Sequence, residues 1–125
     1  MAKDLRVSEL LDYYGDMLTD KQYDAVDYYY NDDLSLGEIA ENLGISRQGV
    51  RDSIKRAEAA MLELEEKLRL MERMQKIQRS LSVLRKNIDI IDEKNIKIYR
   101  SDVINESIKV ILKELEKLND QTELV

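Results

Sequence analysis

Residues 33–56, DLSLGEIAENLGISRQGVRDSIKR, constrain the fold most, because they contain the start and stop signals of two helices in one short stretch. Ser35, followed by Glu38 three residues later, forms the capping-box pattern of a helix N-terminus. Gly44 stands where the end of a helix favours a left-handed residue. Ser46 can cap the next helix, which leaves a turn of about three residues. The pattern predicts a helix-turn-helix motif.

Apolar residues recur at helical spacing on both sides of this turn, as they do when two short helices pack on a core. The first stripe contains Leu36, Ile39, Ala40 and Leu43, and the second contains Val50, Ile54 and Ala57. Ile45, in the turn, is expected to fill the angle between the helices. Ala40, Gly44 and Val50 supply a small residue where the helices cross, a glycine in the turn and a branched anchor, at the spacing that a helix-turn-helix requires.

The start of the second predicted helix has the side chains that suit contact with nucleic acid. The candidate binding residues are Ser46, Arg47, Gln48, Arg51, Asp52, Lys55 and Arg56. Arginine and glutamine read base edges in the major groove, and arginine and lysine contact phosphates. The alternative is a helical hairpin that only packs, or one that docks a protein.

The distribution of charge favours a short, specific contact. Residues 1–45 hold three cations against eleven carboxylates, a net charge of −8, whereas residues 46–56 hold four cations against one carboxylate, a net charge of +3. The remaining residues contribute −1 to the total of −6. A basic helix on an acidic body argues against non-specific coating of polyanions and is compatible with one localised contact.

Composition excludes several classes of protein. The chain has no proline and four glycines, and 37% of its residues are charged, which is typical of an all-α protein with long helices. Without cysteine or histidine it lacks thiolate nucleophiles, the usual general base near neutral pH and the commonest zinc ligands. No long apolar run or signal-peptide pattern is present. We therefore expect a cytoplasmic protein that lacks most hydrolytic chemistry, has no cofactor or metal, and does not contact membranes.

Two further helices are predicted before the motif. Residues 4–17 have apolar positions near a period of 3.6, and Thr19 with Gln22 repeats the capping-box pattern for a second helix. Tyr28–Tyr30 lie about 100° apart on that helix, so they cannot all be core residues. The exposed ones either pack with the hydroxyl at the surface or contact a partner such as an unpaired base.

An apolar seam with spacings of three and four residues runs from Ile54 to Ile91. Between Met71 and Met74 the spacing of the apolar residues is three where the pattern requires four, which predicts either a bend or an overwound coiled coil. A helix with a bare apolar seam must fold back on another helix or pair with another chain.

A last helix is predicted after a polar connector at residues 92–100. Ser101 and Asp102 offer a cap, and an apolar stripe then continues to Asn119. We expect this helix to form an antiparallel pair with the preceding one, and a homodimer to supply further helices.

Seven cations between residues 67 and 86 are accompanied by a single carboxylate, Glu72. They are Lys67, Arg69, Arg73, Lys76, Arg79, Arg85 and Lys86. This set is either the solvated side of a helical bundle or a secondary basic face that tracks phosphates, of RNA in particular.

Two segments of the chain, LTDKQ at 18–22 and YYNDDLSLGEIAENLGISRQGVRDSIKRAE at 29–58, resemble the YlxM family of small bacterial helix-turn-helix proteins. The DNA-binding-like part of that family is similar to region four of sigma factors. The resemblance covers about the first 90 residues, and the segment after residue 92 is longer than expected for the family. It implies a gene linked to the signal recognition particle GTPase, an accessory or regulatory role in that protein-targeting pathway, and no enzymatic activity.

Carried over by position, the family's recognition-helix pattern falls on Ser46, Arg47, Gln48, Asp52, Ile54, Lys55 and Arg56. Gly49 stands where alanine is expected, and Arg51 where tyrosine is expected. Glycine in the first turn lowers local helix stability by about 1 kcal/mol.

Taken together, the sequence predicts an all-α fold with a winged-helix-like or sigma region-four-like helix-turn-helix domain at residues 1–58. A helical extension at 59–119 would form a coiled-coil or bundle dimer, and residues 120–125 would be a frayed tail. The expected partners are DNA, the RNA of the signal recognition particle, or its GTPase. The remaining alternative is a structural helical dimer that serves as a scaffold.

Overall fold

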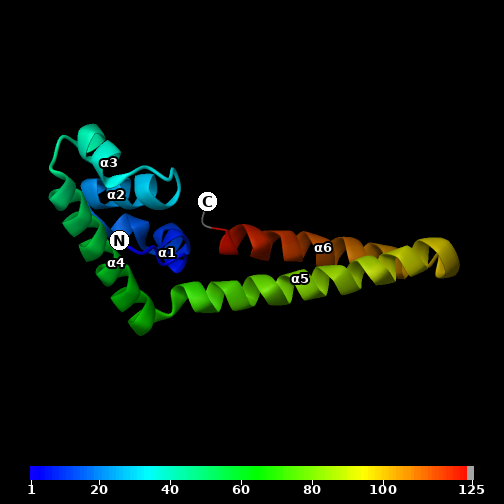
Figure 1. Ribbon diagram of the computed structural model, residues 1–125. Coiled ribbons are helices and arrows are strands. Elements are labelled where there is room, and N and C mark those ends of the chain that lie inside the picture. Colours follow the sequence, from blue (N-terminus) through cyan, green and yellow to red (C-terminus); the bar gives the residue numbers. More distant parts are fainter. Residues whose placement is uncertain (124–125) are drawn as a thin grey trace. The chain divides into compact units, whose positions relative to one another are not determined.

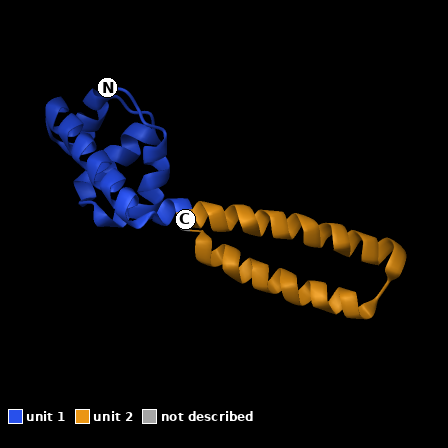
Figure 2. Ribbon diagram, turned by 90° about the horizontal axis from the view of Figure 1, so that it is seen from below, with its two compact units in different colours: residues 1–72 blue, residues 73–125 orange. Residues whose placement is uncertain are grey.

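The structure is a computed structural model that describes residues 1–123, and in this part of the chain every regular element is helical. The elements are α1 (Arg6–Tyr14), η1 (Gly15–Met17), α2 (Asp20–Tyr30), α3 (Leu36–Leu43), α4 (Arg47–Leu68), α5 (Leu70–Lys94), η2 (Asn95–Tyr99) and α6 (Asp102–Thr122). They form two compact units, unit 1 over residues 1–72 and unit 2 from residue 73 onward (Figure 2). The all-α prediction is confirmed. The domain boundary predicted after residue 58 falls inside α4, whereas the units divide after Glu72.

In unit 1, α4 packs against α1, α2 and α3 (Figure 1). One group of buried side chains comprises Val7, Leu10, Leu11, Tyr14, Val26, Ala57, Met61 and Met71. A second group comprises Ala25, Tyr29, Ile39, Ala40, Val50 and Ile54. Because α4 contributes to both groups, its first three turns are held rigidly against the other helices.

Each predicted cap in unit 1 is present. The side chains of Thr19 and Ser35 accept hydrogen bonds from the third backbone N–H of α2 and of α3, and both capping boxes are complete. Gly44 ends α3 with φ +67°, a left-handed conformation that costs glycine little. The first helix is shorter than predicted, because α1 begins at Arg6. Leu5, one of the apolar positions within the predicted helix 4–17, precedes α1 and is exposed.

The long apolar seam is interrupted at Arg69. This residue has φ +53° and ψ +33°, which ends α4, and α5 starts at the next residue. The sequence predicts an irregularity between Met71 and Met74, and the helix break lies two residues before that step. The chain from Arg47 to Lys94 is therefore two helices.

Side chains from α1 and α4 hold this break. The Glu65 carboxylate accepts hydrogen bonds from the backbone N–H groups of Met71 and Glu72, at 3.0 and 3.1 Å. The Tyr14 hydroxyl donates to Glu65 at 2.6 Å and accepts from the Leu70 N–H at 3.1 Å. The first N–H groups of α5 are thus capped by side chains of other helices. These are Glu65 on α4 and Tyr14 on α1, which lies 56 positions before Leu70 in the chain.

Unit 2 is an antiparallel pair of helices, α5 and α6, as Figure 2 shows. Side-chain hydrogen bonds join the two halves of the hairpin near each end. The Gln78 amide donates to the Thr122 carbonyl at 2.9 Å, and the Asn95 amide exchanges two hydrogen bonds with the Ser101 backbone at 2.9 and 3.0 Å. The antiparallel arrangement agrees with the sequence prediction, and Ser101 caps α6 as expected.

Two segments of unit 2 differ from the prediction in detail. The connector predicted at residues 92–100 is largely helical, because α5 continues to Lys94 and Asn95–Tyr99 form a π-helical turn. Asn95 is buried, and its hydrogen bonds to Ser101 satisfy the backbone at the turn. The predicted fraying from residue 120 is wrong for 120–122, which belong to α6, and residues 124–125 lie outside the described part of the chain. Within residues 1–123, no helix combines the length and the apolar character needed to cross a membrane.

Candidate nucleic-acid interface

The turn between α3 and α4 positions the start of α4. Ser46 is the N-cap, and its hydroxyl accepts a hydrogen bond from the Gly49 N–H at 2.9 Å. Ile45 is partly buried against the second core group, which confirms that it fills the angle between the helices. Val50 and Ile54 are fully buried on the inner side of α4. These contacts fix which side of α4 faces outward.

All seven predicted binding residues are exposed. Ser46 precedes the helix, and the others lie on its first three turns: Arg47, Gln48, Arg51, Asp52, Lys55 and Arg56. At 100° per residue, the six helical positions span about half of the helix circumference, from Arg47, which borders the buried side of Val50 and Ile54, to Arg56. The structure therefore brings the predicted residues together on one open surface, which we call the α4 face.

The hydrogen bonds of the α4 face leave its arginines available. The Gln48 amide donates to Asp52 at 3.0 Å, so the only carboxylate of the face binds a neutral group. Among residues 1–123, Arg47, Arg51 and Arg56 have no carboxylate partner. A guanidinium without a carboxylate partner can bind a phosphate or a guanine edge without first breaking an ion pair.

A shallow groove of about 540 Å³ lies at the junction of α3 and α4. It is lined by Gly37, Ala40, Glu41, Gly44, Ile45, Ser46 and Arg47. The Arg47 side chain lies over Gly37, where an added Cβ would be 3.6 Å from the guanidinium Nε atom. Arg47 therefore lies at the edge of the α4 face that is nearest to α3.

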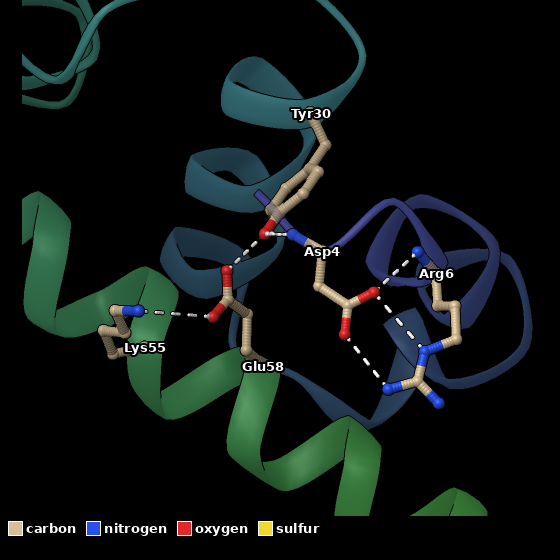
Figure 3. A network of polar contacts seen from close by, with 5 residues as sticks. All are labelled: Asp4, Arg6, Tyr30, Lys55 and Glu58. Atoms are coloured by element: carbon tan, nitrogen blue, oxygen red, sulfur yellow. Dashed lines mark hydrogen bonds and ion pairs between the residues drawn. The ribbon is translucent and has the colours of Figure 1, made fainter. Parts of the chain in front are cut away.

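Lys55 is connected to a polar network that the sequence did not predict (Figure 3). Its ammonium lies 4.0 Å from Glu58, and the other Glu58 oxygen accepts a hydrogen bond from the Tyr30 hydroxyl at 2.5 Å. The Tyr30 hydroxyl also accepts from the Asp4 N–H at 3.3 Å, and Asp4 pairs with Arg6 at 3.1 Å. The N-terminal segment, α2 and α4 are thereby joined beside the α4 face.

In the sequence, the run Tyr28–Tyr30 was the feature that could have indicated this network. Tyr29 is buried and its two neighbours are partly buried, which agrees with the prediction that the three cannot all be core residues. The sequence could not identify Glu58 as the partner, because the pairing depends on how α2 packs against α4.

Burial and the hydrogen bond to Glu58 raise the pKa of the Tyr30 hydroxyl well above its usual value. The raised pKa means that the folded protein retains a proton that the unfolded chain loses at a pH of about 10. This stabilising contribution is complete below that pH and is lost as the pH rises toward the pKa in the folded state. We expect the urea midpoint of unit 1 to fall between pH 8 and pH 10.5, and Tyr30→Phe to reduce that fall. An identical fall in the variant would contradict the assignment to Tyr30.

The seven cations at 67–86 divide between the two units. Lys67 and Arg69 belong to unit 1, and the other five lie on α5 in unit 2. All seven are exposed, but Lys67 pairs with Glu63 at 2.9 Å and Arg85 pairs with Asp89 at 3.2 Å. A groove of about 580 Å³ between α5 and α6 contains charges of both signs. Its lining includes Arg85, Lys86, Glu116 and Asp120.

Comparison with known proteins finds similarity along most of the chain. A family described as "Putative helix-turn-helix protein, YlxM / p13 like" matches residues 1–100. A UPF0122 protein of Thermoanaerobacter sp. (strain X514) is 47% identical over 110 residues, which cover 88% of this chain and 91% of the relative. A UPF0122 protein of Bacillus cereus (strain AH187) is 41% identical over 119 residues, or 95% of this chain and 99% of the relative. The expectation of an unusually long segment after residue 92 is wrong, because this relative extends across that segment.

Proposed function

This chain belongs to the UPF0122 family of YlxM/p13-like helix-turn-helix proteins, and from that premise we propose that it binds duplex DNA through the α4 face. The observation that carries the proposal is the presence of Arg47, Arg51 and Arg56 on one exposed surface without carboxylate partners among residues 1–123. In helix-turn-helix proteins the second helix of the motif enters the major groove by its N-terminal part. The α4 face occupies that part of the corresponding helix.

Charge limits the kind of complex that this surface can form. Residues 46–56 have a net charge of +3, whereas the rest of the chain has −9. The acidic remainder repels phosphates outside the contact, so binding depends on a short basic segment. We therefore propose a localised, salt-sensitive complex in which the four cations contact phosphates and position α4, and Gln48 reads base edges.

The biological setting that we propose follows from the family resemblance. It is an accessory or regulatory role in the signal recognition particle pathway, without enzymatic activity. The RNA and the GTPase of the particle are the alternative partners. The exposed cations of α5 would then be the contact surface, because proteins recognise RNA duplexes mainly through their shape and phosphates.

Titration of the full chain with duplex DNA and with the RNA of the particle, each at two salt concentrations, tests these alternatives. We expect tighter binding to duplex DNA. With about four phosphate contacts, the slope of log K against log salt would be about −3.6. Preference for the RNA would favour the α5 surface, and the absence of binding to either at low salt would contradict nucleic-acid binding and leave a structural scaffold.

A further inference from the structure

Unit 2 buries little of its apolar surface. Among its described residues, Leu81 and Ile108 are the buried aliphatic side chains, although apolar residues recur along both helices. Two long helices in water require an apolar core to remain paired, because their intrinsic helix propensity contributes little. The apolar residues left exposed in unit 2 are therefore the feature to be explained.

These residues follow the heptad pattern of helical bundles. In α5, Met74, Leu81 and Ile88 lie seven residues apart and are buried or partly buried, and α6 repeats this pattern at Ile108, Leu115 and Thr122. Three residues after these inner positions, and three after the partly buried Ser101, come aliphatic residues that remain between 37% and 52% exposed. They form what we call the outer stripe: Ile77, Leu84, Ile91, Ile104, Ile111 and Leu118.

Both halves of the outer stripe lie on the same side of the hairpin. In two antiparallel helices whose inner positions face each other, positions that share one heptad offset turn to a common side. The groove between α5 and α6 supports this assignment. Its lining includes Gln78, Arg85 and Asn119, each four residues after an inner position and therefore on the opposite side. Unit 2 thus has one polar side and one aliphatic side.

We propose that the outer stripe packs against the outer stripe of a second copy of this chain, so that two hairpins form a four-helix bundle. The core of such a bundle uses two positions of every heptad on each helix. The hairpin by itself covers the inner positions and leaves the outer stripe about half exposed. A second hairpin supplies the same aliphatic residues at the same spacing, and a surface that pairs with itself is what a two-fold dimer requires.

The amount of exposed apolar surface fits this partner. The outer stripe is flanked by Val83, Ile90, Val103 and Val110, which are between 56% and 77% exposed. Ten aliphatic side chains, about half exposed and with roughly 60–120 Å² of apolar surface each, present on the order of 500 Å². A standard interface buries about 800 Å² per partner, of which about 65% is apolar in homodimers. A short peptide would cover only part of two helices of this length.

This interface goes beyond the proposed function and does not depend on nucleic-acid binding. Sedimentation equilibrium of the full chain is expected to give twice the chain mass of 14.7 kDa. It is also expected to give the single-chain mass for the double variant Leu84→Glu, Ile111→Glu. The matched control is Ile96→Glu, because Ile96 is 62% exposed but lies in the η2 turn, away from the outer stripe. A monomeric wild type, or a double variant that stays dimeric, would overturn the proposal.

A milder variant covers the case in which the two glutamates unfold the hairpin. Leu84→Ala, Ile111→Ala keeps high helix propensity and removes only the packing surface. We expect it to retain its far-UV circular dichroism at high concentration and to raise the dimer dissociation constant by about tenfold or more, whereas Ile96→Ala leaves the constant unchanged. An unchanged constant in the double alanine variant would refute the interface. The melting temperature of the wild type should also rise with protein concentration.

Discussion

Replacing Arg47, Arg51 and Arg56 together by alanine is expected to lower the affinity for duplex DNA by at least about 100-fold near 0.15 M salt. The three side chains are exposed on the α4 face without carboxylate partners among residues 1–123, so their removal deletes contacts without freeing a buried charge. Each phosphate contact that is lost should reduce the magnitude of the slope of log K against log salt by about 0.9, or by about 2.7 for all three. Fluorescence anisotropy at several salt concentrations measures both quantities.

The matched control removes three cations elsewhere. Lys109, Lys113 and Lys117 are exposed on α6, and two of them pair with glutamates on the same helix. Their triple alanine variant changes the net charge by the same amount but should alter DNA affinity less than about threefold. Equal losses in the two triple variants would show that total charge, and not the α4 face, governs binding.

The second large effect is expected for Glu65→Ala, which should lower the free energy of unfolding of unit 1 by about 2–4 kcal/mol. The substitution leaves the N–H groups of Met71 and Glu72 and the Tyr14 hydroxyl without their acceptor. It also removes the carboxylate that offsets the positive end of the α5 dipole. Urea unfolding followed by tyrosine near-UV circular dichroism measures the loss, because six of the seven tyrosines belong to unit 1.

Glu66→Ala is the control for this prediction, because Glu66 is the next residue on α4, carries the same charge and is exposed. Glu66→Ala should change the free energy of unfolding of unit 1 by less than about 0.5 kcal/mol. If the two variants were equally stable, the carboxylate of Glu65 would not be the cap that maintains the helix break.

Local signals were sufficient for the helix-turn-helix motif. Ser35, Gly44 and Ser46 mark helix ends through interactions that span only a few residues, so the sequence reveals them without knowledge of packing. The exposure of Gln48 and Lys55 followed from the same reasoning, because the inner side of α4 is set by the spacing of Val50 and Ile54. The hydrogen bond from Tyr30 to Glu58 did not follow, since it joins residues of different helices.

The helix break shows where sequence reasoning stops. No glycine or proline lies near Arg69, and the seam predicts an irregularity only between Met71 and Met74. A left-handed arginine costs about 1–2 kcal/mol, so it persists because Tyr14 and Glu65 satisfy the N–H groups that it exposes.

The sequence by itself determined the helical elements, their caps, the motif and the basic character of α4, because each depends on interactions within about one helical turn. The tertiary structure decided where the long helix breaks, that Tyr30 bonds to Glu58, and which apolar positions of unit 2 remain uncovered. The physical reason is that these features depend on hydrogen bonds and burial between segments far apart in the chain, and helical periodicity does not specify which distant segments meet.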